Sequence, residues 1–512
     1  GEASLHNEET PFLHEGEALL DRKKRFGGIH PLLRRGLGRL SFITKKTPFS
    51  HEREALLDRK KRLGGIHPLL WRGLGRLLLH TRKAPLRRES GGVRFFEHYI
   101  LNGISMLKTD LDIAVIGGGA AGFMAAITAK ETHPEARVTI FERALKVLAK
   151  VEVTGGGRCN VTNSFARITD LKQAYPRGHK LMKRLMSTFN HEDTYRWFEQ
   201  RGVPLVTQED ECVFPKAQDS HVVMDCLTRQ ATRLGVTICC RSRLTGLTQM
   251  EDGRWQLAFQ QGSHRIFQRV IITTGGSPQA HGLAYLAELG HTIEPPVPSL
   301  FTFNIRDKAF CNLMGTVVDP VVMSIPGSKM RSVGALLVTH WGVSGPATLK
   351  LSSYAARFLA EKDYHSPLAI SWTGERKRQE VEEELLRLQA QNPRKQIGTL
   401  HPFSLPQRLW TYVISKLGLE TCKPWAEIGR KTMNRIVETL TNDQYVIDGK
   451  GTFRDEFVTC GGVSLSSVHA QTLESKHCPG LFFAGEVLDV DAITGGFNLQ
   501  AAWTMGVVVG RQ

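Results

Sequence analysis

The sequence predicts an α/β fold in which a doubly wound parallel sheet is joined to an insert that is first β-rich and then helical. Three observations lead to this prediction. Short apolar segments with β-branched residues recur along the chain, as in buried parallel strands. The first of them runs directly into a glycine-rich turn and an apolar helix. From about Pro298 the pattern changes to strand-like pieces followed by amphipathic helices.

The first strand–helix–strand unit is predicted between residues 111 and 142. Leu111–Ile116 (LDIAVI) is the first strand, Ala120–Lys130 is the helix, and Arg137–Phe141 (RVTIF) is the second strand, which runs into Glu142. The turn at 117–122 has the sequence GGGAAG. Strand, turn, helix, second strand and acid therefore follow in the order that a dinucleotide-binding unit requires.

Each residue type in this turn has a physical reason. Gly117 permits the tight turn, Gly119 lets the backbone approach a pyrophosphate, and Gly122 lets the helix pack closely on the strand. The helix N-terminus offers N–H groups and a positive dipole to phosphates. Glu142 lies 20 residues beyond Gly122, where a carboxylate accepts hydrogen bonds from ribose hydroxyls. An acid at this place favours an unphosphorylated ribose, as in FAD or NAD.

Two further glycine-rich segments favour FAD over NAD. Residues 154–163 (TGGGRCNVTN) follow the second strand and are rich in hydrogen-bond donors. Residues 485–500 (GEVLDVDAITGGFNLQ) follow a predicted strand at Gly480–Ala484 and precede an apolar helix at Ala501–Gly510. A strand, a glycine loop and a helix N-terminus suit the isoalloxazine end of a flavin, because the helix dipole stabilises negative charge near N1 and the C2 carbonyl.

These segments resemble the BaiN-like flavoproteins, a family of NAD(P)/FAD-dependent oxidoreductases that includes aminoacetone oxidase-type FAD-binding enzymes. The matching pieces are IGGGAAGFMAA at 116–126, GGGRCNVTN at 155–163, VTHWGVSGPATLKLS at 338–352, and the long block FVTCGGVSLSSV…TLESKHCPGLFFAGEVLDVDAITGGFNLQAAW at 457–503. The resemblance runs from about Leu107 to Gln512 and does not cover residues 1–105.

The resemblance implies a set of cofactor-binding residues in an FAD-binding Rossmann-like domain. They are Gly117, Gly119, Ala121, Gly122, Glu142, Lys150, Gly157, Arg158, Cys159, Asn160, Thr162, Gly485, Asp489, Gly496, Phe497, Asn498 and Leu499. Residues 270–276 (VIITTGG) are predicted as another strand, at whose end flavoproteins of this class return the chain to the cofactor, here at Gly275. The chain departs from the family just after it, because residues 274–279 run quickly into a helix where relatives often have a longer Ser/Gly/Thr-rich loop.

The domain boundaries follow from these patterns. Residues 106–298 and 460–512 are predicted to form the FAD-binding domain, and residues 299–459 a substrate-side insert. In the insert, strands are expected at Leu300–Ile305, Val317–Ile325 and Ala335–Val338, and helices at Glu375–Gln391, Pro406–Leu417 and Trp425–Leu440, within a helical lobe at about 375–440. The first of these helices presents Val381, Leu385, Leu386 and Leu388 on one side.

The first hundred residues differ from the rest. Residues 14–40 and 51–77 are identical at 24 of 27 positions, which indicates a recent duplication rather than a solenoid. Residues 1–108 hold 22 Lys/Arg against 11 Asp/Glu, so most of the net charge of +17 lies there. We expect residues 1–105 to be a basic arm that is disordered or not native, and Met106, the first methionine, to be the natural start.

The composition excludes several other classes. The nine cysteines include no C-x-x-C pair, which argues against a disulfide framework or thiolate zinc site and favours a reduced, cytoplasmic setting. No run of about 18 apolar residues exists, so no membrane span is predicted. Hydrolase and NTPase motifs are absent as well. We expect a small-molecule substrate, with no metal and no membrane partner, and any nucleic-acid contact to come from the basic arm alone.

The leading hypothesis is an FAD-dependent oxidoreductase that transfers a hydride between the flavin and a small organic substrate, such as an enone, a keto compound or an amine. NAD(P)H is a possible donor, although only one dinucleotide fingerprint occurs. The alternatives are an NAD-dependent dehydrogenase without flavin, a flavoprotein associated with nucleic acid, and a non-catalytic flavin sensor. No catalytic residue is assigned, but His340 and Trp341 are candidates to face the substrate, and Asp489 is preferred over Glu486 and Asp491 for cofactor contact.

Overall fold

The computed structural model describes residues 111–512 with the exception of 278 and 452–457. The predicted basic arm at 1–105 and the predicted start at Met106 lie outside the described residues.

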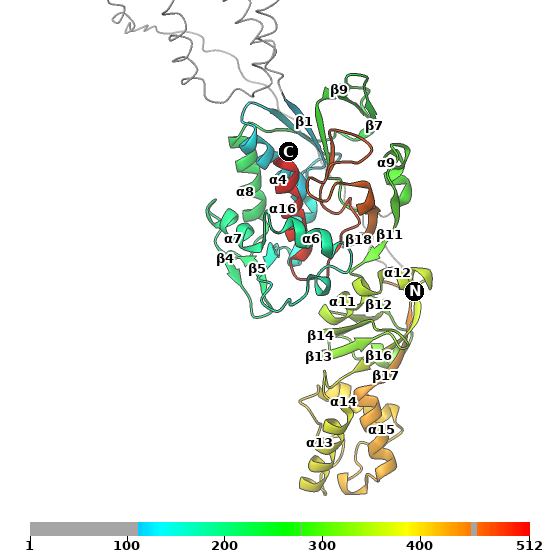
Figure 1. Ribbon diagram of the computed structural model, residues 1–512. Helices are drawn as coiled ribbons and strands as arrows, with labels where there is room; N and C mark the ends of the chain where they lie inside the picture. Colours follow the sequence, from blue (N-terminus) through cyan, green and yellow to red (C-terminus); the bar gives the residue numbers. More distant parts are fainter. Residues whose placement is uncertain (1–110, 278, 452–457) are drawn as a thin grey trace, which may run out of the picture. The chain divides into compact units, whose positions relative to one another are not determined.

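A five-stranded parallel sheet organises the first of two hydrophobic cores (Figure 1). Its strand order is β19-β10-β1-β2-β6, with all neighbours parallel. The strands are β1 (Asp112–Ile116), β2 (Arg137–Phe141), β6 (Thr237–Cys239), β10 (Arg269–Ile272) and β19 (Leu481–Phe483). The predicted α/β fold with a parallel sheet is confirmed, and the C-terminal segment supplies an edge strand.

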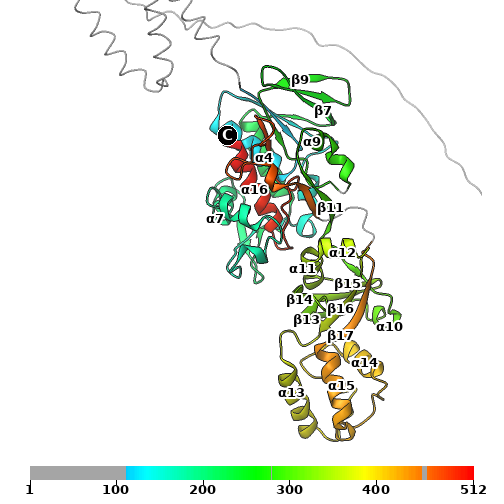
Figure 2. The ribbon, with the colours of Figure 1, turned by 45° about the vertical axis from the view of Figure 1, so that its right-hand side comes forward.

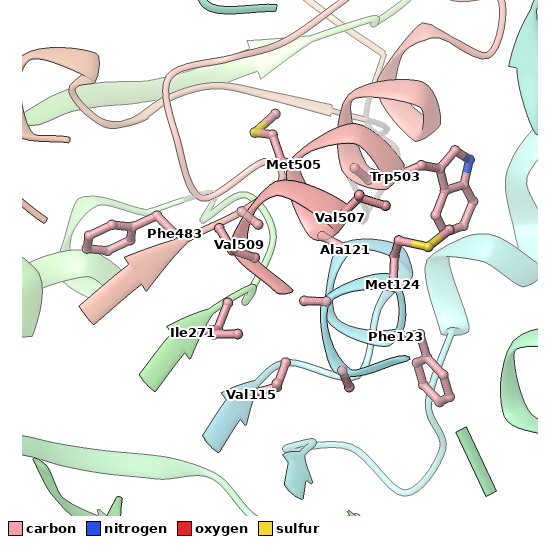
Figure 3. Packing of buried hydrophobic residues seen from close by; sticks show 14 of the residues in the cluster. Val115, Ala121, Phe123, Met124, Ile271, Phe483, Trp503, Met505, Val507 and Val509 are labelled. Carbon is pink, nitrogen blue, oxygen red and sulfur yellow. The ribbon is translucent and has the colours of Figure 1, made fainter. Parts of the chain in front are cut away.

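Two buried apolar helices pack along each other on this sheet. They are α4 (Ala120–Thr132) and α16 (Phe497–Gly510), and α16 begins four residues before the predicted Ala501. A Cβ on Gly506 would lie 2.8 Å from the carbonyl oxygen of Ala121, and a Cβ on Gly510 would lie 2.6 Å from that of Ala125. Moving four residues along α16, from Gly506 to Gly510, moves the contact four residues along α4, from Ala121 to Ala125, so the two helices run parallel. Figure 3 shows their side chains packing beside β1, β10 and β19.

Smaller elements complete this part of the chain. Helix α8 (His221–Arg233) also packs on α4. Antiparallel three-stranded sheets are formed by β3, β5 and β4 (Thr162–Asn163, Cys212–Pro215, Leu205–Thr207) and by β7, β8 and β9 (Leu244–Gln249, Trp255–Phe259, His264–Phe267). The remaining helices are α5 (Ala149–Val153), α6 (His179–Leu185), α7 (His191–Glu199) and α9 (Ala284–Glu288).

The second hydrophobic core lies between an antiparallel six-stranded sheet and its helices. The strand order is β12-β15-β14-β13-β16-β17, formed by Phe303–Asn304, Gly342–Ser344, Arg331–Thr339, Val317–Ser324, His365–Ser371 and Asp443–Asp448. The helices are α10 (Lys308–Cys311), α11 (Pro346–Tyr354), α12 (Ala356–Glu361), α13 (Arg378–Gln391), α14 (Gln407–Lys416) and α15 (Arg430–Thr441).

Three predictions about this part need correction. The strand expected at 300–305 is only β12, because Leu300 has a left-handed backbone with φ 59°. The helix expected at 425–440 is a short 3-10 helix at Trp425–Glu427 followed by α15, which begins after an extended Gly429. In α13, Val381 and Leu385 are buried and Leu388 packs against the core, but Leu386 is 47% exposed. Leu386 therefore faces solvent and not the core.

An antiparallel strand pair connects the two cores. Strand β11 (Ile293–Ser299) leads from the first core toward the second, and β18 (Val458–Val463) leads back, with Pro298 opposite Thr459. Figure 2 shows β11 running to the end of the six-stranded sheet where α11 and α12 lie. The chain therefore leaves and re-enters the part built on the parallel sheet through adjacent strands.

Candidate functional site

The glycine turn after β1 has two closely packed positions and one open position. Gly117 has φ 115°, and a Cβ there would lie 2.3 Å from the carbonyl oxygen of Thr273. A Cβ on Gly122 would lie 2.0 Å from the carbonyl oxygen of Gly117, so helix α4 rests directly on the turn. Around Gly119, no atom lies within 4 Å of a Cβ. The backbone at the start of α4 is therefore open on the side where a pyrophosphate would approach.

Glu142 is fixed beside this turn by two backbone groups. Its Oε2 accepts a hydrogen bond from Gly118 N at 2.8 Å, and its Oε1 accepts one from Ala144 N, also at 2.8 Å. The half-buried carboxylate thus stands at the carboxyl end of β2, next to the helix N-terminus, as the sequence predicts for a ribose-binding acid.

The segment at 154–163 lies against the C-terminal glycine loop. Thr162 Oγ1 donates to Gln500 Oε1 at 2.6 Å, and Asn163 Nδ2 donates to Gly495 O at 3.1 Å. With its amide oriented to satisfy its neighbours, Asn160 Oδ1 accepts from Gly496 N at 3.1 Å. A Cβ on Gly496 would lie 2.2 Å from Thr162 O, so this approach requires glycine.

Three other residues of the 150–160 segment have different surroundings. Cys159 is fully buried, and burial raises the pKa of its thiol to about 12, so the side chain packs as a neutral group. The exposed Arg158 guanidinium lies 4.3 Å from the centre of the Phe214 ring and donates to Gly155 O. Gly157 has no atom within 4 Å of a Cβ.

The three acids after β19 point to different places. Glu486 pairs with Lys150 at 3.2 Å and accepts from Thr459 N at 2.7 Å. Its Oε2 lies 3.9 Å from the Cβ position of Gly275, at the end of β10. Asp489 instead accepts from Arg357 on α12 at 2.8 Å and from Gly461 N at 3.1 Å.

Asp491 is buried and pairs with Arg177, and it also accepts from Ser299 Oγ at 2.9 Å. The geometry therefore favours Glu486, which joins Lys150 and Gly275, as the carboxylate on the cofactor side. The signal in the sequence is its position immediately after Gly485 at the end of a parallel strand.

The first turn of α16 is held by its own loop and by aromatic packing. Asn498 accepts from Ala492 N and donates to Ala492 O, both at 2.9 Å, which closes the loop before the helix. The buried Phe497 meets the Phe165 ring edge-on at 5.0 Å, and its carbonyl accepts from Tyr175 Oη. Leu499 packs against the first core. The leading N–H groups of α16 have no partner inside the helix and are available to a ligand.

The structure brings most of the predicted residues together. Ala121 and Gly485 are in contact, because a Cβ on Gly485 would lie 2.9 Å from that of Ala121. The turn at 117–122, the segment at 155–163 and the loop at 485–498 thus meet at the carboxyl ends of β1, β10 and β19. Two of the predicted residues, Cys159 and Phe497, are buried in the core, and Asp489 forms an ion pair with Arg357. His340 is exposed in the turn between β14 and β15, where its ring lies 4.3 Å from that of Trp341.

Within the described residues, no group of three His, Cys, Asp or Glu side chains is arranged to hold a metal ion. In the same part of the chain, no helix is long and apolar enough to cross a membrane.

A strand–glycine turn–helix unit, an acid at the end of the second strand, and a C-terminal glycine loop that completes the site define a dinucleotide-binding flavoprotein fold. The family model described as the HI0933-like protein Rossmann domain matches residues 111–512. The chain belongs to this HI0933-like family and is an FAD-dependent oxidoreductase. The family-level resemblance predicted from the sequence is thereby confirmed.

Two curated relatives match over most of their length. A 3-dehydro-bile acid delta(4,6)-reductase from Clostridium scindens is 26% identical over 407 residues, which are 78% of this chain and 98% of the relative. A ribosomal RNA dihydrouridine synthase from Haemophilus influenzae is 27% identical over 401 residues, 76% of this chain and 95% of the relative. Among solved structures, a 3-ketosteroid-delta4-(5alpha)-dehydrogenase from Rhodococcus jostii is 15% identical with a TM-score of 0.43, covering 80% and 99% of the two chains.

Proposed function

We propose that this chain reduces a carbon–carbon double bond conjugated to a carbonyl group in a small organic substrate, with NAD(P)H as the electron donor. The names of both curated relatives describe such a reduction. One acts on the delta(4,6) double bonds of a 3-dehydro bile acid, and the other converts uridine, whose double bond is conjugated to a ring carbonyl, to dihydrouridine. The two relatives share a reaction type but not a substrate. At 26% and 27% identity, we therefore carry over only the reaction type to this chain.

The observation that supports a cofactor-dependent reaction most directly is the open backbone at Gly119 beside two closely packed glycines. Of the predicted residues, Gly117, Gly119, Ala121 and Gly122 would hold the pyrophosphate, and Glu142 the ribose. Lys150, Gly275 and Glu486 would meet the ribityl chain, and Gly496, Asn498 and Leu499 at the start of α16 the flavin ring. Bound FAD would supply a hydride for transfer to the substrate.

The protein groups orient the cofactor and balance its charge. The backbone N–H groups at the start of α4 would donate to the phosphate oxygens of bound FAD, and those at the start of α16 would stabilise the negative charge that the flavin gains on reduction. Asn160 and Thr162 fix the glycine loop ahead of α16 through Gly496 N and Gln500. A side chain at Gly496 or Gly122 would collide with a backbone oxygen, so both positions require glycine.

We also propose a reducing, cytoplasmic setting and a small-molecule substrate. All nine cysteines are free thiols, and three of the buried ones, Cys159, Cys226 and Cys478, are packed in the first core. The relatives named as ribosomal RNA dihydrouridine synthases make uridine in RNA the second candidate substrate. The assay described below distinguishes a small-molecule enone from uridine in RNA when RNA is included as an additional acceptor.

The test is a stepwise anaerobic titration of the full-length holoprotein. NADH and then NADPH are added, and bleaching of the flavin bands near ~450 nm is followed. A simple enone, 2-cyclohexen-1-one, is then added to the reduced protein. We expect bleaching with one of the two donors and recovery of the bands with formation of cyclohexanone. Bands that stay unbleached with both donors, but bleach with an amine, would replace this proposal with an amine oxidation.

A further inference from the structure

The insert contains a cavity of about 330 Å³ beside one end of its six-stranded sheet. It is lined by the hairpin between β13 and β14, the last residue of β16, the segment that leads into α13, and the last residue of α15. Helices α13 and α15 lie side by side next to the sheet (Figure 1 and Figure 2). The volume falls within the range of small-molecule sites. Every lining residue belongs to the insert, so the cavity is separate from the three glycine-rich segments.

The strand register defines the floor of this cavity. Ser324 of β13 lies opposite Arg331 of β14, and Val322 of β13 lies opposite Ser371 of β16. Residues directly opposite each other in an antiparallel pair share a face of the sheet, and so do residues two apart on one strand. These four side chains are therefore on one face. Met323, between two of them, is fully buried in the second core, so the floor lies on the outer face of the sheet.

The rim of the cavity is basic. Its cations are Lys329, Arg331 and Arg376, and Glu375 is the one carboxylate among the described residues that line it, so three positive charges and one negative charge leave +2. Arg331 Nη2 donates to Glu375 Oε1 at 2.9 Å, with the two side chains 55% and 65% exposed. Such a hydrated pair is weak, and a stronger anion can compete with the carboxylate.

Several donors of the lining are available to a ligand. Among the residues that the structure describes, no hydrogen bond or ion pair engages the Lys329 ammonium or the half-buried Ser324 hydroxyl. Arg376 is held at the rim, because its Nη1 donates to Thr373 O at 3.2 Å and its guanidinium lies 5.1 Å from the centre of the Phe403 ring. Its other N–H groups remain for a ligand.

A phosphate group fits these donors better than a carboxylate. It has three strong acceptor oxygens, whereas a carboxylate has two in one plane. The guanidinium groups match phosphate geometry with paired donors, and the ammonium adds a point charge. Val322 and Met330 supply apolar surface for the group that carries the phosphate.

We propose that this cavity binds a phosphate ester, carried either by a free nucleotide or by an RNA strand. Lys329, Arg331 and Arg376 neutralise the phosphate charge, and Ser324 donates to it from the floor. The inference goes beyond the proposed function and does not depend on it, because none of these residues takes part in holding the flavin.

The test is an isothermal titration of the FAD-loaded full-length protein with uridine 5′-monophosphate at low ionic strength. FAD fills the other phosphate-binding site of the chain. We expect Lys329→Met and Arg376→Met each to weaken binding by about tenfold, and Lys329→Arg to retain most of it, because charge-assisted hydrogen bonds are lost in the first two and kept in the third.

Lys362→Met is the matched control, because it removes the same charge from the insert. Lys362 is exposed and precedes β16, at the opposite end of that strand from Ser371. This variant should bind the nucleotide like the wild type. A thermal melt of each variant checks that the fold is kept.

A fluorescein-labelled oligouridylate, followed by fluorescence anisotropy, distinguishes the two sources of the phosphate. Lys329-dependent binding that is tighter for the oligouridylate than for the mononucleotide would assign the site to RNA. Lys329-dependent binding that is no tighter for the oligouridylate would assign it to a free nucleotide. Binding of neither probe that depends on Lys329 and Arg376, or uridine binding as tightly as its monophosphate, would overturn the proposal.

Discussion

Neighbouring glycines of the turn after β1 have different roles, and they can be tested one by one. Gly119→Ala adds a methyl group where the chain has no atom within 4 Å, at a backbone φ of −93° that alanine accepts. We predict unchanged thermal stability of the cofactor-free protein and FAD binding weakened by about tenfold or more, since the methyl group occupies the pyrophosphate side. Equilibrium dialysis with FAD and a thermal melt measure the two effects.

Gly122→Ala is the matched comparison. Its methyl group would lie 2.0 Å from Gly117 O, so the cofactor-free protein itself should lose about 1–3 kcal/mol of stability. If Gly119→Ala bound FAD as tightly as the wild type, the open side of the turn would not be the pyrophosphate site.

Substitutions of Glu486 and Asp489 are expected to differ in their effect on FAD binding. Glu486→Gln keeps an acceptor for Thr459 N but removes the charge beside Lys150 and Gly275. We predict that its FAD affinity falls by about tenfold, as expected when a charged hydrogen-bond partner becomes neutral. Asp489→Asn should bind FAD normally, because that carboxylate is engaged by Arg357. A larger loss of FAD from Asp489→Asn in the same dialysis would restore the assignment made from the sequence alone.

At the scale of elements, the contact between α4 and α16 positions both helix N-termini. Gly506→Leu would push its side chain against Ala121 O and the Met124 Cβ, each 2.8 Å from the Cβ position. We predict a loss of about 3 kcal/mol in the free energy of unfolding, near the upper end of the usual cost of overpacking. Urea denaturation measures it, with Gly429→Ala as the control because its Cβ meets no atom within 4 Å. A wild-type midpoint for Gly506→Leu would show that the two helices can separate without cost.

The elements of the nucleotide-binding unit could be predicted because local chemistry specifies them. The β-branched strand at 112–116 and the glycine turn demand one geometry, and β1, α4 and β2 have nearly the predicted bounds. The start of α16 could not be fixed in this way, because Gly496 begins the helix through its contact with Thr162 O, 334 positions earlier in the chain. The role of Glu486 depends on which distant segments, at Lys150 and Thr459, lie against it, and a single sequence does not contain that information.

Over the molecule as a whole, two arginine–aspartate pairs lie where the insert meets the nucleotide-binding part. Arg177 pairs with the fully buried Asp491 and donates to Ser353 O of α11, and its side chain is 12% exposed. Arg357 of α12 pairs with Asp489, but it is 42% exposed. The two ion pairs resemble each other in chemistry, but they differ in how much water surrounds them.

Replacing each arginine by methionine should therefore give different results. Arg177→Met leaves Asp491 buried without its charge partner, and we predict a loss of about 3–5 kcal/mol. Arg357→Met leaves Asp489 open to solvent, and we predict a loss of about 0–1 kcal/mol in the free energy of unfolding. Chemical denaturation followed by tryptophan fluorescence compares them. Equal and small losses would show that the Arg177 pair does not stabilise the contact with the insert.

Whether the three glycine-rich segments hold FAD can be determined from one absorbance spectrum. The full-length protein is incubated with FAD, freed from unbound cofactor, and its visible absorbance is recorded, after which the released cofactor is identified by mass. We predict flavin bands near ~450 nm and stoichiometric FAD. A colourless protein that retains no FAD, while its circular dichroism shows a folded α/β chain, would contradict it.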